Sequence, residues 1–188
     1  MRIISGIAKG KKIIIPIDKN TRPLKDLVRE SIFNIITHSG LLNRKMTECI
    51  VLDLFSGVGS FGLEAISRGA KKVVFYENYN PAIELLNKNI NNLSFNNQAE
   101  VNCSDIYSIN NIKKIENKFD IIFLDPPFKD ENIINVLQIL CERKIFKTDS
   151  LVVLHRHKKS KDNLNKFLKI IREEIYGSSK IFFGQFNI

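Results

Sequence analysis

The sequence predicts a doubly wound α/β fold with a mostly parallel sheet, and three observations carry that prediction. Short apolar runs alternate with segments of helical periodicity between residues 49 and 154. A glycine-rich turn over residues 56–60 follows the first run. The fourth run ends directly in Asp125-Pro126-Pro127-Phe128. Both polar segments are expected at the carboxyl ends of parallel strands, where this class of fold binds its ligands.

The N-terminal residues predict a small extension ahead of the sheet. Two isoleucine-rich runs flank a stretch of glycine and lysine over residues 6–12, a pattern typical of a hairpin that ends at Pro16. Pro23 stands in the first turn of an expected helix, which Gly40 ends. We therefore expect a basic hairpin and helix over residues 1–42 and the main domain over residues 43–188.

The spacing of apolar residues then places the other elements in order. Strands are expected over residues 49–55, 72–77, 100–103, 119–124 and 151–154, and helices over residues 61–67, 80–93 and 131–143. Residues 169–176 and 180–186 alternate in hydrophobicity around the turn Gly177-Ser178-Ser179. This alternation predicts a closing hairpin at the C-terminus.

Length and composition indicate one globular domain. The 188 residues are 44% hydrophobic and 26% charged, which excludes a disordered chain, collagen and a coiled coil. No apolar run approaches the ~18 residues of a membrane span, and the N-terminus lacks a signal-peptide pattern, so we expect a cytoplasmic protein. We expect a monomer, because no spare apolar helix or strand is evident. The three cysteines are far apart, so neither a disulfide framework nor a metal site is expected.

Positive charge gathers at two places along the chain. The net charge is +9, with +6 in residues 1–29 and +5 in residues 155–169 around an acidic middle. Such basic stretches favour a nucleic acid partner, which they would bind through phosphate contacts, and the alternative is a solvated lysine-rich surface. The candidate phosphate ligands are Arg2, Lys9, Lys11, Lys12, Arg22, Lys25 and Arg29.

The glycine-rich turn has the spacing of a nucleotide-binding loop. Residues 57–62 fit G-x-G-x-x-G between a strand and a helix, and Glu77 follows 20 residues after Gly57, where an acid can bind ribose hydroxyls. This pattern serves either NAD or S-adenosylmethionine. Asp53 favours S-adenosylmethionine, because its carboxylate would attract a cationic methionine group and repel a pyrophosphate. Asp105, after the third strand, suits either an adenine amine or a helix cap.

The DPPF segment, residues 125–128, indicates the chemistry. Its two prolines fix the backbone and remove two donors, which leaves carbonyl acceptors in set directions. The Asp125 carboxylate and the Pro126 carbonyl can both accept from one exocyclic amine, while the Phe128 ring stacks on the base that carries it. Asp125 can also take the proton as it leaves. The alternative is a loop that the prolines only stiffen.

These segments together resemble the RsmD family of bacterial methyltransferases, which modify guanine N2 in 16S ribosomal RNA. The similarity covers nearly the whole chain. It includes Arg2-Ile3-Ile4-Ser5-Gly6, Thr21-Arg22-Pro23, Val28-Arg29-Glu30, the run from Leu52 to Gly59, residues 62–70 and the DPPF segment. The N-terminal segments are the more specific part, because the glycine loop and DPPF alone indicate only an amino-methyltransferase.

The resemblance implies a Rossmann-like class I S-adenosylmethionine-dependent fold of seven strands, the last antiparallel. It implies a guanine of 16S ribosomal RNA that is everted into the site. We expect a small-subunit particle to present this guanine, and naked RNA stays open as the alternative. Asp125, Pro126, Pro127 and Phe128 would then be catalytic, without a metal. The expected cofactor-binding residues are Asp53, Phe55, Ser56, Gly57, Gly59, Glu77, Asn78, Asp105 and Ile106. One departure is His155-Arg156-His157, which ends the fifth strand where an acidic residue is expected.

Other functions stay open on the sequence. A methyltransferase acting on an adenine N6 amine in DNA or RNA would use the DPPF segment in the same way, with two acceptors for the amine and a ring that stacks on the base. An NAD-dependent oxidoreductase would explain the glycine loop and Glu77, but Asp53, the DPPF segment and the short chain oppose it. A non-catalytic RNA-binding module would explain only the charge. For His155 and His157, packing at the strand edge or RNA contact is favoured over a metal or general-base role.

Overall fold

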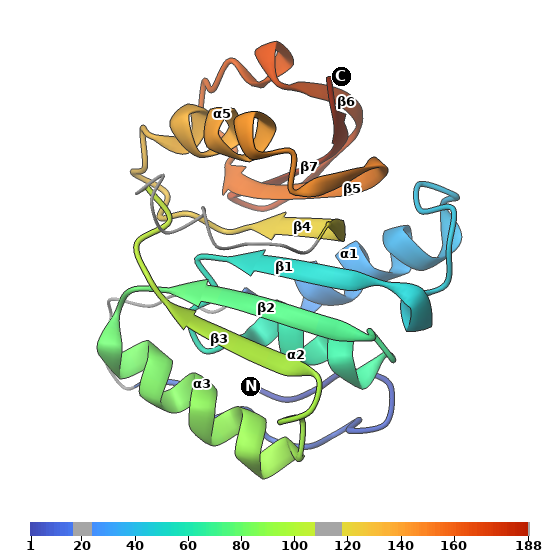
Figure 1. Cartoon of the computed structure of the whole chain (residues 1–188), viewed down its shortest axis with the longest axis vertical. Coiled ribbons are helices and arrows are strands. Elements are labelled where there is room, and N and C mark those ends of the chain that lie inside the picture. The colour runs from blue at the N-terminus through green and yellow to red at the C-terminus, as the bar shows by residue number, and fades with distance from the viewer. Residues whose placement is uncertain (17–23, 108–117, 188) are drawn as a thin grey trace.

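A computed structural model describes residues 1–16, 24–107 and 118–187 and confirms the predicted α/β fold (Figure 1). Seven strands form one sheet in the order β3-β2-β1-β4-β5-β7-β6. They are β1 (Ile50–Leu54), β2 (Lys72–Glu77), β3 (Ala99–Cys103), β4 (Phe119–Leu124), β5 (Phe146–His157), β6 (Leu168–Tyr176) and β7 (Ser179–Phe186). Strands β1 to β5 pair in parallel, and β7 pairs antiparallel with both β5 and β6. The closing hairpin is thus confirmed.

Helices cover both faces of the sheet. They are α1 (Asp26–His38), α2 (Ser60–Ser67), α3 (Asn80–Leu93) and α5 (Ile133–Arg143), with short 3-10 turns at Met46–Glu48 and Leu164–Lys166. Buried residues of α1, α2 and α3 share one hydrophobic cluster with the sheet, and those of α5 share the cluster on the other face. The predicted bounds of β2, α3 and β4 coincide with the observed ones. The expected helix start at Thr21-Arg22-Pro23 lies outside the described residues.

Strand β5 is longer than the sequence predicts. The apolar run covers only residues 151–154, whereas the strand extends from Phe146 to His157. At its end, residues 155–157 pair with residues 179–181 of β7, after β4 has ended at Leu124 opposite Leu154. A prediction from apolar runs misses this end, because backbone pairing with β7 extends it through polar residues.

Aromatic rings align α1 and α2 over β4. The Phe61 ring of α2 stacks on Phe123 of β4, with centroids 3.9 Å apart, and on Phe33 of α1 at 4.8 Å. All three rings are buried. Stacked aromatic pairs of this kind stabilise the packing beyond the effect of the apolar area that they bury. They therefore hold α2 in place directly after the glycine loop.

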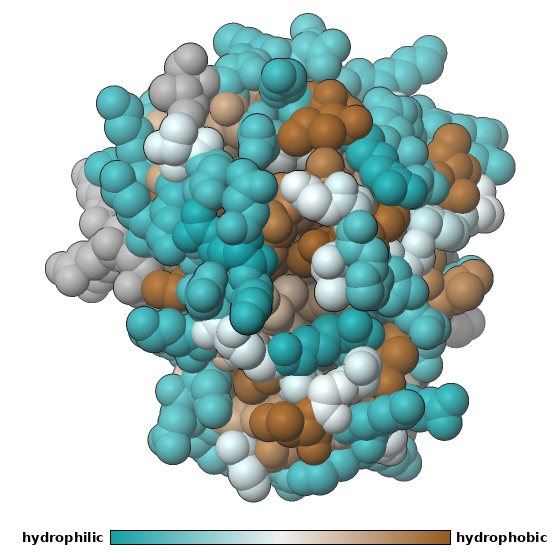
Figure 2. Space-filling model, turned by 90° about the vertical axis from the view of Figure 1, so that its right-hand side faces the viewer, coloured by the Kyte–Doolittle hydropathy of each residue, from teal (hydrophilic) through white to brown (hydrophobic). Residues whose placement is uncertain are grey.

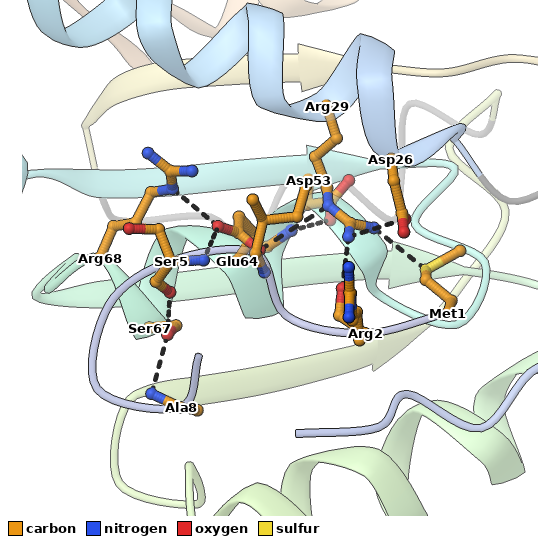
Figure 3. Close-up of polar contacts among 12 residues, drawn as sticks. Met1, Arg2, Ser5, Ala8, Asp26, Arg29, Asp53, Glu64, Ser67 and Arg68 are labelled. Atoms are coloured by element: carbon orange, nitrogen blue, oxygen red, sulfur yellow. Dashed lines mark hydrogen bonds and ion pairs between the residues drawn. The ribbon is translucent and has the colours of Figure 1, made fainter. Parts of the chain in front are cut away.

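The N-terminal segment has less strand structure than predicted. The expected hairpin is present but short: Arg2 and Lys12 form an antiparallel bridge, and three backbone hydrogen bonds join residues 1–3 to residues 10–13. Between the two arms, side chains of α2 bind the backbone of the turn. Glu64 accepts from the N–H groups of Ile4 and Ser5, at 2.7 and 2.9 Å, and Ser67 Oγ accepts from Ala8 N–H (Figure 3).

A buried ion pair completes this attachment. Arg29 of α1 and Glu64 of α2 are both fully buried, with Arg29 Nε 3.7 Å from a Glu64 carboxylate oxygen. The Arg29 guanidinium also donates to the Arg2 carbonyl at 2.5 Å and to Asp26 at 3.0 Å (Figure 3). The extension therefore packs into the core of the main domain, and its division from it at residue 42 stays a prediction.

The outer surface is mostly polar on the side away from the strand arrowheads. Figure 2 shows this side, where hydrophobic patches are separated by hydrophilic residues. Among the residues that the structure describes, no helix is long and apolar enough to cross a membrane.

We expect Glu64→Gln to destabilise the protein by about 3–5 kcal/mol, because removing one charge of a buried pair leaves Arg29 uncompensated. The variant also presents an amide donor to the N–H groups of Ile4 and Ser5. The matched control is Glu84→Gln, an exposed carboxyl on α3, with an expected change within about 0.5 kcal/mol. Urea unfolding gives both free energies. Equal values for the two variants would contradict a structural role of the Glu64 charge.

Candidate functional site

The parallel strands end at one edge of the sheet, where the arrowheads of β1, β2 and β4 lie in Figure 1. Register places Asp53 of β1 beside Phe123 of β4, and Phe123 beside Val153 of β5. Because side chains alternate along each strand, Asp53, Asp125 and His155 point to the same face of the sheet. The sequence therefore brings three titratable groups together on adjacent strands.

The glycine loop between β1 and α2 adopts the open turn that its sequence predicts. Phe55, Gly57 and Gly59 all have positive φ, at 59°, 54° and 81°. A Cβ added at Gly57 would meet no atom within 4 Å, so the loop borders open space there. A Cβ at Gly62 would lie 2.2 Å from the Phe75 ring, so the last glycine lets α2 pack closely on β2.

Glu77 at the end of β2 holds this loop in place. One carboxylate oxygen accepts from Gly57 N–H at 2.7 Å, and the other accepts from Asn78 and Tyr79 N–H at 2.9 Å each. The predicted role in binding ribose hydroxyls is compatible with these bonds, since the oxygen that accepts from Gly57 N–H has a second lone pair.

Asp53 is the most unusual group of the site. Its side chain is 1% exposed and one oxygen accepts from Gly62 N–H in the first turn of α2, at 2.9 Å. The other oxygen, Oδ1, is buried and has no hydrogen-bond partner among the described residues. Burial raises the pKa of Asp53 well above its ordinary value, and the nearby Asp125 and Glu77 carboxylates raise it further, against the Gly62 hydrogen bond. An unpartnered buried acceptor of this kind suits a cationic ligand.

His155 orients the Asp125 carboxylate. Its Nδ1 lies 2.7 Å from Asp125 Oδ1, and the His155 side chain is 7% exposed. Opposite a carboxylate, Nδ1 carries the proton and donates, which leaves Asp125 Oδ2 as the second acceptor. The sequence prediction missed this role, because it follows from the register of β4 and β5 rather than from any local pattern.

The Phe128 ring stands between two histidines. Its centroid is 5.3 Å from that of His155 and 5.4 Å from that of His157, both in edge-on arrangements. On the other face of β5, the buried Arg156 donates to the carbonyls of Pro127, at 3.4 Å, and Asp130, at 2.6 Å. The DPPF segment is therefore fixed from both faces of the sheet.

The loop after β3 joins the same site. Asp105 is exposed and accepts from Tyr107 N–H at 3.0 Å, as a helix cap would, so both roles predicted for it stay open. The Tyr107 hydroxyl forms a hydrogen bond with Asp130 beyond the DPPF segment. The Tyr107 ring also lies 5.5 Å from Phe55 of the glycine loop. Of the other predicted cofactor residues, Ser56 and Ile106 are buried and Asn78 is exposed.

The predicted phosphate ligands divide into three groups. Arg2, Lys9, Lys11, Lys12 and Lys25 are exposed and stay candidates. Arg22 lies outside the described residues. Arg29 is a correction: its side chain is 0% exposed and is held by Glu64, Asp26 and the Arg2 carbonyl, so it cannot reach a phosphate.

The donor set fits S-adenosylmethionine. The unpartnered oxygen of Asp53 is suited to its cationic methionine group, and the open space at Gly57 leaves room beside Glu77. Across residues 1–16, 24–107 and 118–187, no three His, Cys, Asp or Glu side chains gather as a metal site would need.

Known proteins resemble this chain in sequence and in structure. Residues 1–185 match the family model described as Conserved hypothetical protein 95. The Haemophilus influenzae protein named Ribosomal RNA small subunit methyltransferase D is 35% identical over 161 residues, which cover 84% of this chain and 79% of that one. A homologue of the same name from Buchnera aphidicola is 34% identical over 168 residues, 89% of this chain and 80% of that one.

Solved structures confirm the class I methyltransferase fold. An Escherichia coli protein aligns over 100% of this chain and 98% of its own, with a TM-score of 0.81 and 24% identity. The rRNA methyltransferase aviRa from Streptomyces viridochromogenes has a TM-score of 0.71 at 10% identity, over 92% of this chain and 89% of its own. At these identities the similarity shows the fold alone.

We expect Asp53→Asn to change how stability depends on pH. Because the pKa of Asp53 is raised by folding, its contribution to stability is present below the unfolded pKa and is lost as pH rises through the folded pKa. The asparagine still accepts from Gly62 N–H but cannot ionise. The free energy of unfolding of the variant should therefore rise relative to the wild type over that interval, as measured by urea unfolding at a series of pH values. A difference that is constant with pH, or of opposite sign, would contradict this account.

Proposed function

The chain belongs to the Conserved hypothetical protein 95 family, the RsmD family, and we propose that it methylates the exocyclic N2 amine of a guanine in 16S ribosomal RNA. The observation that carries this proposal is the DPPF segment, with Asp125 oriented by His155 at 2.7 Å. The names of the relatives from Haemophilus influenzae and Buchnera aphidicola support small-subunit ribosomal RNA as the substrate.

We infer that the base amine binds between two fixed acceptors. Asp125 Oδ2 remains available because Oδ1 bonds to His155. The Pro127 carbonyl already accepts from Asp130 N–H and Arg156, whereas the Pro126 carbonyl has no partner among the described residues. The Phe128 ring, fixed by the two histidines, would stack on the base.

The amine is a weak nucleophile because its lone pair is delocalised into the base, and these acceptors would compensate for that weakness. S-adenosylmethionine, when bound, supplies an electrophilic methyl group on a sulfonium. Asp125 and the Pro126 carbonyl would hold the amine hydrogens and stabilise positive charge that develops on nitrogen. Asp125 would then take the proton that the methylated nitrogen loses. Asp53, Gly57, Gly59 and Glu77 would bind the cofactor, together with Phe55, Ser56, Asn78, Asp105 and Ile106.

The remaining expectations follow from this substrate. A base in a ribosomal RNA helix must be everted to reach DPPF, so a small-subunit particle that presents the base is the expected acceptor. The exposed basic residues of the N-terminal segment would contact its phosphates. In bacteria such a substrate is cytoplasmic, and we expect the enzyme to act as a monomer without a metal.

We expect Asp125→Asn to lower methyl transfer by about 10²–10⁴-fold, because the amide cannot accept the proton. The assay uses labelled S-adenosylmethionine with three acceptors: small subunits lacking the modification, naked 16S ribosomal RNA, and duplex DNA. The expected product is N2-methylguanine in ribosomal RNA, and cofactor binding by the variant controls for folding. Label on adenine N6 would favour the alternative substrate, and absence of transfer to every acceptor would refute the proposal.

We expect His155→Leu to lower kcat by up to about 100-fold while the KM for S-adenosylmethionine stays near that of the wild type. The leucine fills the space but cannot hold Asp125. His155→Asn places an amide N–H close to the position of Nδ1 and should recover most of the loss. Steady-state kinetics of the two variants separate orientation of Asp125 from packing. Equal defects in both variants would indicate a packing role only.

A further inference from the structure

We propose that a lysine-rich wall beside the DPPF segment binds the phosphates of RNA nucleotides that flank the target base. The wall consists of the loop of residues 158–163, called here the lysine loop, together with Lys129. It borders a surface depression of about 490 Å³ whose lining includes Phe128, His157, Lys159 and Lys161. Phe128 thus belongs both to this depression and to the proposed base site. The inference rests on the proposed function, since it places RNA at that site.

The lysine loop is attached rigidly to the DPPF segment. Arg156, 2% exposed, donates to Asp162 of the loop at 2.8 and 3.1 Å. The same guanidinium donates to the carbonyls of Pro127 and Asp130. The buried Arg156 guanidinium therefore fixes the distance between the base site and the lysines. A fixed distance is required if the lysines are to bind the phosphates next to the target base.

Hydrogen bonds of backbone N–H groups hold the first half of the loop. Lys158 N–H donates to the Ser178 carbonyl of the β6–β7 turn at 2.8 Å, and Ser160 N–H donates to the His157 carbonyl at 2.9 Å. Lys159 N–H donates to His157 Nδ1 at 3.2 Å, which also sets the ring that contacts Phe128. His157 thus connects Phe128 of the base site to Lys159 of the loop through a ring contact and a hydrogen bond.

The charges of the depression favour a polyanion. Asp162 is paired with Arg156, and Asp130 accepts from the Tyr107 hydroxyl and from Asn132 N–H. In contrast, Lys129, Lys159 and Lys161 are exposed and form no ion pair with a described residue. Glu131 is the one exposed acid of the lining.

Single-stranded RNA is the ligand that matches both features. An everted base that stacks on Phe128 carries a phosphate on each side, so at least one phosphodiester must leave the base site along its rim. Lysine ammonium groups bind such phosphates as point charges, with little sequence preference. The depression is open and is lined mostly by charged and polar residues, which fits a backbone that passes across it better than an enclosed small molecule.

The test compares Lys159→Gln/Lys161→Gln with a matched control, Lys45→Gln/Lys118→Gln. The control lysines are also exposed, but they precede β1 and β4 and so lie at the opposite edge of the sheet. Binding to naked 16S ribosomal RNA is measured over a series of salt concentrations. For two lost phosphate contacts, the slope of log K against log salt should become shallower by about 1.4 in the loop variant and stay unchanged in the control.

Methyl transfer supplies the second readout. The loop variant should show a KM for the RNA acceptor raised by about tenfold or more at moderate salt, with the kcat and the KM for S-adenosylmethionine unchanged. A salt slope equal to that of the wild type, or an equal change in the control, overturns the inference. If the wild type binds RNA but transfers no methyl group, the proposed function fails while the salt slopes still decide whether the wall binds RNA.

Discussion

A single buried carboxylate, that of Glu64, ties the basic N-terminal segment to the methyltransferase fold. It accepts from two backbone N–H groups of that segment and faces the buried Arg29 of α1. The same helix α2 begins at Ser60, and in its first turn Gly62 N–H donates to Asp53 of β1. Helix α2 is thus held by a carboxylate at its start and by another toward its end. The position of the glycine loop and that of the N-terminal lysines therefore depend on one short helix.

In both Asp53 and Asp125, one carboxylate oxygen forms a hydrogen bond within the protein and the other is left for a ligand. Asp53 uses one oxygen for α2 and leaves the other unpartnered, and Asp125 uses one for His155. This division keeps both side chains fixed while preserving an acceptor on each. The cost appears in the raised pKa of Asp53, since burial and neighbouring negative charge both disfavour its ionised form. A cationic cofactor would relieve that cost, which links stability to binding.

Much of the fold could be predicted from local patterns. The bounds of β2, α3 and β4 follow from apolar periodicity, and the DPPF segment lies where a buried strand ends. Burial of polar residues could not be predicted this way. Arg29 occupies a charged first turn of α1, and its buried partner Glu64 lies 35 residues later on another helix. The attachment of the predicted N-terminal hairpin could not be predicted for a related reason, because its turn binds side chains of α2 that lie about 60 residues later.

The end of β5 shows why the site needs an antiparallel strand. Strand β4 ends at Leu124 to release the DPPF segment, so β5 has no parallel partner beyond Leu154 on that side. Pairing with β7 carries β5 onward for three residues, from His155 to His157. Alternation then directs His155 to Asp125 on one face and Arg156 to the Pro127 carbonyl on the other. The insertion of β7 between β5 and β6 is therefore what allows one strand to hold the DPPF segment from both faces.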